Sequence, residues 1–392
     1  MVTGLLAALV LLAVDPPQVT ARLVTGPEAD SNSRREISGQ VPQPDVLWRS
    51  QASVALSHTE GIHRLTVDGQ WGAKVFATQH TEDLLVAETR FRWDMRPFPI
   101  LGVFAELGGR DRRQRSGARS YTTSSADVGV SVGPLGPVTL LWGMGPRSFV
   151  FWPVRGVTGC DGDRWCVESL GSIEQWDLLV PKESLLRFSN VGAGTFAALL
   201  VQLTGVEVLS LTSGVDGRYF PLGLRAAAVE DGARVFDERG RARTTAQWLG
   251  QLRTPVRRMD GSIFGEVTVE SVRVLYLRAS ARVIGNTSTS RGEQYLRGRL
   301  GLTAGGLLPG GVRLLVEGQV QATRWPEGLG LGERLALQEG DESQSSLSAQ
   351  LSVPLRSGLW VEGRTAAYAA EFSTARTPFL RLVAFVGMGW RW

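Results

Sequence analysis

The sequence is short of lysine, histidine, cysteine and long apolar runs. Lysine occurs twice, at Lys74 and Lys182, and there are 3 histidines and 2 cysteines in 392 residues. The longest apolar run, 5–14, falls well below the about 18 residues that a membrane-spanning helix needs. Charged residues make up 20%, against about 25% in ordinary soluble domains. These shortages exclude a helical polytopic membrane protein, a coiled coil and a disordered chain. A net charge of only +4, spread along the chain, predicts no nucleic-acid partner.

Glycine is abundant instead, at 47 residues, and apolar and polar residues alternate with a period of two. In 84–95, Leu85, Phe91 and Trp93 alternate with charged residues. The same pattern recurs in 272–283, 294–304, 312–323, 345–355 and 359–369. A helix would bring apolar residues back every three or four positions, so these stretches are predicted to be β-strands with one apolar face.

The length of these strands distinguishes two β architectures. Strands of a soluble sandwich have about five or six residues, whereas a transmembrane barrel needs spans of about 9–11. Tryptophans lie near predicted strand ends, as in an interfacial aromatic girdle: Trp48, Trp93, Trp325, Trp360 and Trp390. We therefore predict an all-β protein, a transmembrane antiparallel up-and-down β-barrel of about 16–18 strands over 45–392. The stretch 153–260 is ambiguous between strands and an inward plug.

The N-terminus has the layout of a secretory signal, because the apolar stretch is followed by Pro16-Pro17 and then by small residues that end at Ala21. We expect a signal peptide over 1–21 and a periplasmic segment over 22–44. The usual basic residues at the start are missing, and a buried N-terminal strand is one alternative.

Residues with catalytic or metal-binding chemistry are few. In an exported protein, Cys160 and Cys166 are predicted to form a small disulfide loop. His58 follows Ser57 directly, and neighbouring residues of a strand point to opposite faces. GxSxG, HExxH and phosphate-binding glycine motifs are missing in a suitable context. We predict no enzyme, no metal site and no cofactor.

If the apolar faces meet lipid, the opposite faces line the lumen. That set holds eleven basic and six acidic residues: Arg64, Asp68, Lys74, Glu88, Arg90, Arg92, Asp94, Glu106, Arg278, Arg282, Arg297, Arg299, Arg313, Glu317, Glu362, Arg364 and Arg381. Buried ions are destabilising by several kcal/mol each, so this density predicts a wet lumen, which a barrel of this size is wide enough to hold. The expected function is a conduit for hydrophilic cargo.

The excess of arginine favours an anionic solute or an acidic polymer as cargo. The basic cluster comprises Arg278, Arg282, Arg297, Arg299 and Arg313, and the acidic partners are Glu88, Glu317 and Glu362. In a simple hairpin register Arg278 faces Arg299, which is unfavourable without an anion or a carboxylate between them. Alternatively, Glu317 and Glu362 neutralise these arginines in a structural network.

A second basic run, 109–119, contains Arg110, Arg112, Arg113 and Arg115. Counting strands from residue 45 places it in a periplasmic loop. It is either a docking site for an acidic partner or peptidoglycan, or a solvated loop.

The last strand, FLRLVAFVGMGWRW, has apolar residues at alternate positions back from its terminal aromatic: Val386, Met388, Trp390 and Trp392. It resembles the C-terminal insertion signal of Gram-negative outer-membrane barrels. The resemblance implies outer-membrane localisation, contact with outer-membrane lipid and recognition by the barrel-assembly machinery. In length and arginine-rich composition the chain is also similar to barrel components of polysaccharide-export translocons, which implies a periplasmic export partner and a polysaccharide cargo. The alternatives are a general or anion-selective porin, a barrel-embedded enzyme, and a structural or adhesive barrel.

Overall fold

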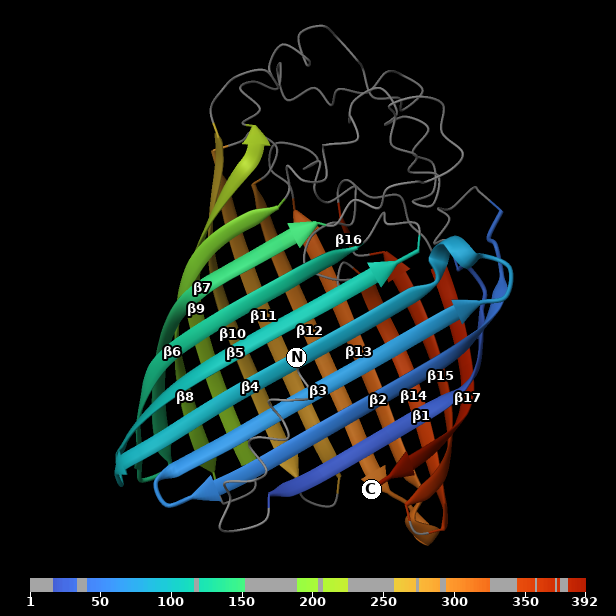
Figure 1. Cartoon of the computed structure of the whole chain (residues 1–392), viewed down its shortest axis with the longest axis horizontal. Helices are drawn as coiled ribbons and strands as arrows, with labels where there is room; N and C mark the ends of the chain where they lie inside the picture. The colour runs from blue at the N-terminus through green and yellow to red at the C-terminus, as the bar shows by residue number, and fades with distance from the viewer. Residues whose placement is uncertain are drawn as a thin grey trace, which may run out of the picture.

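The computed structural model describes residues 17–33, 41–115, 120–151, 189–203, 207–224, 257–272, 275–289, 294–324, 344–356, 358–370, 372–373 and 380–392. Its sheet has 17 strands, of which β16 (Phe372–Ser373) has two residues. The other 17 − 1 = 16 strands are long, and they close into one barrel (Figure 1). The described residues contain no helix long and apolar enough to cross a bilayer.

The strands follow one another around the barrel in chain order. They are β1 (Gln18–Asp30), β2 (Asp45–Glu60), β3 (His63–Phe76), β4 (Leu84–Phe98), β5 (Leu101–Gln114), β6 (Tyr121–Leu135), β7 (Val138–Phe151), β8 (Asn190–Leu203), β9 (Glu207–Leu224), β10 (Arg257–Val272), β11 (Tyr276–Ser288), β12 (Tyr295–Leu307), β13 (Arg313–Arg324), β14 (Gln344–Arg356), β15 (Leu359–Ala370) and β17 (Leu380–Arg391). Each pairs antiparallel with its neighbours, and β1 pairs with both β2 and β17, which closes the barrel. The predicted fold class is confirmed, with the strand number at the lower end of the expected range.

The two ends of the barrel differ in the length of their connections. Short connections such as 61–62, 99–100 and 136–137 lie at the end where the chain termini of the sheet meet, and we call this the turn end. The amide of Ala21 donates to the carbonyl of Trp392 there. The longest connections, including 152–189 and 225–256, belong to the opposite end, the loop end.

The barrel begins earlier in the chain than the sequence pattern suggested. Residues 18–30, which we divided between a signal peptide and a periplasmic segment, form β1. Their inward residues include charged Glu28 and Asp30, and Pro27 interrupts the strand pattern because proline cannot donate to a ladder. A signal peptide remains a prediction for residues before β1. Within the ambiguous stretch 153–260 the structure describes β8, β9 and the start of β10 as barrel strands.

The outward face of the barrel is apolar and exposed. Leu85, Leu300 and Val386 are 60%, 62% and 60% exposed, and exposed large aliphatic and aromatic residues recur at alternate positions on most of the long strands. The residues between them point inward, where charged side chains of non-adjacent strands converge: Lys74 of β3 reaches Glu28 of β1. Apolar side chains outside and ions inside reverse the arrangement of a soluble protein.

Candidate functional site: the charged interior of the barrel

The strand register places all seventeen charged residues of the predicted lumen set on the inward face. Opposite residues of an antiparallel pair share a face. The pairs Arg64–Asp94, Asp68–Arg90 and Glu88–Arg110 follow that rule from β3 to β5. On the other side of the barrel, Arg282 lies opposite Arg299. Three groups of inward side chains differ in how their charges are neutralised.

The first group lies where β1 closes the sheet, and we call it the seam network. The side chain of Glu28 is fully buried and accepts from Lys74 Nζ (2.5 Å) and Arg49 Nη1 (3.0 Å). Asp30 is bound through both of its oxygens by the Arg381 guanidinium, also in a buried environment. Buried ions are tolerated when they are paired and hydrogen-bonded, so each carboxylate of the seam network has cations against it.

The seam network continues toward the turn end through Arg22. Its Nη2 donates to Glu362 Oε2 at 2.6 Å, across β17 to β15. Glu362 therefore neutralises an arginine of β1, and not the cluster on β11 and β12 as the alternative reading of the sequence supposed. For Glu317, the described residues show no ion pair within 4.0 Å.

The second group is the wall formed by β4 and β5. Arg90 makes a bidentate pair with Glu106, with both distances 2.8 Å, and Arg92 binds Asp94 through Nε and Nη2. Arg92 also lies over the ring of Phe104, 4.5 Å from its centroid. Bidentate arginine–carboxylate pairs are strong and geometrically fixed, so the charge of this wall is largely compensated within it.

The third group comprises Arg278, Arg282, Arg297 and Arg299 of β11 and β12, which we call the arginine wall. Two of its members are held by neutral groups: Arg299 donates from Nε and Nη2 to Gln321 Oε1 (3.0 and 2.9 Å), and Arg297 donates to Thr323 Oγ1 (3.0 Å). The fifth arginine of the predicted basic cluster, Arg313, lies at the turn end of β13, across from Ser352. On its other side this wall meets β10, where Glu266 lies opposite Arg282 and Glu270 lies opposite Arg278, and Glu266 Oε2 is 3.8 Å from Arg282 Nη1.

The register of the arginine wall differs from the one expected. Arg278 lies opposite Thr303, and it is Arg282 that faces Arg299. Although 286–289 is a run of polar residues typical of turns, β11 continues to Ser288, whose hydroxyl donates to Asp260 Oδ1 (2.5 Å). The connection between β11 and β12 therefore begins after Ser288, and this later start shifts the register in which the two strands pair. The predicted pair of opposed arginines therefore exists, but Arg282 takes the place of Arg278 in it.

Inward residues become buried toward the loop end. Gln321 is 0%, Glu28 1% and Thr323 3% exposed, whereas Arg64, Asp68 and Arg278 toward the turn end are exposed. Charges near the turn end are therefore hydrated, and the polar groups near the loop end rely on protein partners.

The basic run 109–119 is placed differently from the prediction. Arg110, Arg112 and Arg113 belong to β5 and not to a loop, and Arg115 follows the strand directly. Arg112 faces inward and is buried, whereas Arg113 faces outward and pairs with Asp111 (2.9 Å). They lie toward the loop end, opposite the termini, because β1 adds one strand to the count that assigned them to the periplasmic side. These residues therefore belong to a strand and not to a loop, and their docking of a partner stays a prediction.

The remaining predicted residues fall at two places. Val386, Met388, Trp390 and Trp392 all lie on the outward side or at the exposed end of β17, and their function as an insertion signal stays a prediction. Cys160 and Cys166 lie outside the described residues.

Sequence reasoning missed several interior carboxylates. Glu28 and Asp30 were missed with β1, and the predicted lumen set also lacks Glu266 and Glu270 of β10, which lie opposite Arg282 and Arg278. The signal was present for the second pair, since Glu266, Thr268 and Glu270 alternate with Val267 and Val269. Among the described residues, no group of three or more His, Cys, Asp or Glu side chains is arranged to hold a metal ion.

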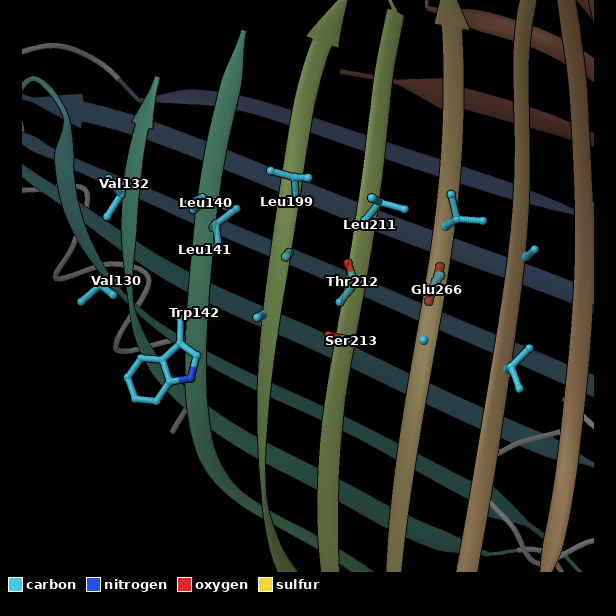
Figure 2. A pocket seen from close by; sticks show the side chains of 16 residues that line it. Val130, Val132, Leu140, Leu141, Trp142, Leu199, Leu211, Thr212, Ser213 and Glu266 are labelled. Carbon is cyan, nitrogen blue, oxygen red and sulfur yellow. The ribbon is translucent and has the colours of Figure 1, made fainter. Parts of the chain in front are cut away.

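The outer surface has a hollow of about 790 Å³ across β6 to β11. Figure 2 shows Leu140, Trp142, Leu199 and Leu211 around it. Ala197, Ser213 and Gly265 lie side by side on neighbouring strands and have small side chains, and Trp142 lies beside Ala197. The hollow belongs to the apolar exterior and is separate from the charged lumen.

No family model matches the chain, and no curated protein matches it. Among solved structures it is similar to a bacterial polysaccharide outer membrane secretin (8% identity, TM-score 0.40, covering 95% of this chain and 98% of that one). It is also similar to Pseudomonas putida OprB (9%, 0.48, 96% and 94%) and to Acinetobacter baumannii OccAB3 (9%, 0.42, 96% and 99%). At this level of identity nothing of the neighbours' activities is carried over to this chain.

Proposed function

We propose that this chain is an outer-membrane channel that passes small hydrophilic solutes and prefers anions. The described long strands have 12 to 18 residues, enough to span a bilayer at the usual tilt. Their apolar outward faces suit hydrocarbon, and their charged inward faces need water. In such barrels the short turns and termini face the periplasm, so the turn end is the periplasmic mouth.

The observation that carries the anion preference is the number of arginines on the inward face. The predicted lumen set holds eleven basic and six acidic residues, and β11 and β12 alone place the four residues of the arginine wall on that face. A surplus of fixed positive charge on a pore wall raises the local concentration of anions and lowers that of cations.

The test is conductance of the purified, refolded barrel in a planar bilayer under a salt gradient. The expected result is an open channel whose reversal potential favours chloride over potassium. Replacing Arg278, Arg282, Arg297 and Arg299 together with alanine should move that potential toward zero.

A charge-neutral double variant, Arg90→Gln with Glu106→Gln, is the matched control, because it removes one cation and one anion of a compensated pair. It should leave the reversal potential unchanged. A barrel that inserts without conducting, or that conducts without anion preference, would overturn the proposal.

A narrower proposal concerns the cargo and the partner. Passage of a polysaccharide chain from a periplasmic export protein requires the same wet, charged lumen as passage of small solutes. Addition of the isolated polymer to the channel would separate them, since a threading polymer interrupts the ion current in discrete events.

A further inference from the structure

The hollow on the outer wall has small side chains at its centre and large ones around it. Its centre is formed by Ala197, Ser213 and Gly265, which lie side by side on β8, β9 and β10. The next outward residues toward the turn end form a parallel row of large side chains: Leu140, Leu199, Leu211 and Val267. Trp142, 47% exposed, lies at one end of the centre, beside Ala197 (Figure 2). A large aromatic ring therefore lies next to a space that small side chains leave open.

The size of this sector suits a protein partner. A closed barrel has a convex wall, so two such walls without a hollow would touch only along a line. The hollow extends from β6 to β11, and five spacings between strands of about 4.8 Å make it about 24 Å wide. With an apolar band about 25 Å tall, the sector offers about 600 Å² on each of two molecules. The total of about 1,200 Å² reaches the lower end of the range for stable interfaces.

Two polar groups at the hollow favour a protein partner over lipid chains. Trp142 lies in the middle of the apolar outward face at 138–146, and not at the membrane boundary where tryptophans are usually found. The hydroxyl of the neighbouring Thr195 donates to the carbonyl of Gly143 (3.0 Å). In contrast, Trp142 Nε1 and the Ser213 hydroxyl make no hydrogen bond within the part of the chain that the structure describes. Hydrocarbon offers no hydrogen-bonding group, whereas a protein surface in the hollow would offer donors and acceptors.

We infer that the hollow is the contact surface for a second copy of this chain, with the Trp142 ring of each copy entering the hollow of the other. A two-fold axis, the commonest symmetry of protein dimers, brings the same sector of two copies together. A sector that carries a large ring beside an open space can match itself in this way, and small side chains let two surfaces in a membrane approach closely. The inference needs the barrel to lie in a membrane and does not depend on the passage of anions.

Resonance energy transfer in phosphatidylcholine vesicles tests this contact. Two pools of the folded barrel, one labelled with a donor dye and one with an acceptor dye, are reconstituted together and diluted with lipid to measure the dissociation constant. Trp142→Ala removes the ring and should weaken association about tenfold or more, since a tryptophan at the centre of an interface carries much of its binding energy. The matched control is Trp71→Ala, because Trp71 is 42% exposed on the outward face of β3 and does not line the hollow. This control should associate as the unaltered protein does.

Gly265→Leu gives a second test should Trp142→Ala fail to fold, which far-ultraviolet circular dichroism would show. Leucine fills the centre of the hollow and should weaken association about tenfold or more, whereas Gly363→Leu should not. Both glycines lie on the outward face, and a Cβ at either meets nothing within 4 Å.

A barrel that stays monomeric at every dilution would overturn the contact, and lipid retained by that monomer in native mass spectrometry would identify acyl chains as the occupant of the hollow. Association that neither Trp142→Ala nor Gly265→Leu weakens would also overturn it, because the copies would then meet through another surface. Conductance plays no part in this measurement. A barrel that associates through Trp142 and never conducts would support the contact and overturn the proposed function.

Discussion

Glu28→Gln removes the central negative charge of the seam network and keeps the shape of the side chain. The carboxylate is fully buried between Lys74 (2.5 Å) and Arg49 (3.0 Å), whose own side chains are 24% and 20% exposed. Breaking a buried pair by removing one partner typically destabilises by about 3–5 kcal/mol. Because both cations retain some contact with solvent, we expect a loss at the lower end, about 3 kcal/mol.

The free energy of unfolding can be followed by guanidinium titration of the barrel in lipid vesicles, with tryptophan fluorescence as the signal. The matched control is Glu317→Gln, since Glu317 is an exposed inward glutamate for which the described residues show no ion pair. That variant should stay within about 0.5 kcal/mol of the unaltered protein. Lys74→Met added to Glu28→Gln should recover part of the loss, because it removes one of the two stranded cations.

A loss below about 0.5 kcal/mol for Glu28→Gln would refute the reasoning. It would mean that water reaches the seam network and screens its charges, so that β1 is held by its backbone ladders to β2 and β17 alone. Equal losses for Glu28→Gln and Glu317→Gln would lead to the same conclusion.

Two further predictions concern the barrel wall. Val386→Arg places a charge at the centre of the outward face of β17 and should destabilise the membrane-inserted barrel by about 2–4 kcal/mol, seen as a lower midpoint of guanidinium unfolding in vesicles. Gly145→Ala should lower the same midpoint, because a Cβ there would overlap the carbonyl oxygen of Ala126. Gly265→Ala should raise it by about 0.5–1 kcal/mol, since a Cβ at Gly265 meets nothing within 4 Å and alanine restricts the unfolded chain.

The inward residues could be predicted from the sequence because the alternation of faces along a strand is fixed by backbone geometry. Once Leu85 and Trp93 were assigned to the apolar face of β4, Arg90 and Arg92 had to point the other way, and the register places them there. One correct residue per strand is enough to orient the whole strand, and an error of one position would have inverted it.

The alternation of apolar and polar residues failed to predict the strand ends that extend past the apolar outer surface of the barrel. At the loop end of β5 the outward residues are Gly109, Asp111 and Arg113, so the alternation that marks the strand disappears before the strand ends. The same holds for β1, whose inward Glu28 and Asp30 look like part of a polar tail. Partners across the barrel stabilise these stretches, and a single sequence does not state which strands become neighbours at closure.

Pairing between strands was less predictable than the direction of side chains. The shift that brings Arg282, and not Arg278, opposite Arg299 depends on where the connection after β11 begins. Ser288 stays in the strand because its hydroxyl binds Asp260 of β10, a contact between two strands whose register is itself unknown from sequence. Turn composition alone therefore places the connection only to within a few residues.

Arg282→Gln tests how the charge of Arg282 contributes to the stability of the barrel. The substitution relieves the repulsion between opposed guanidinium groups and should raise the free energy of unfolding by about 0.2–1 kcal/mol, although the contact with Phe264 is lost. A gain in stability would mean that the repulsion from Arg299 outweighs the attraction of Glu266, which lies opposite Arg282 on β10. Guanidinium unfolding is the measurement, and a clear loss of stability would instead make Arg282 a structural partner of Glu266 and Phe264.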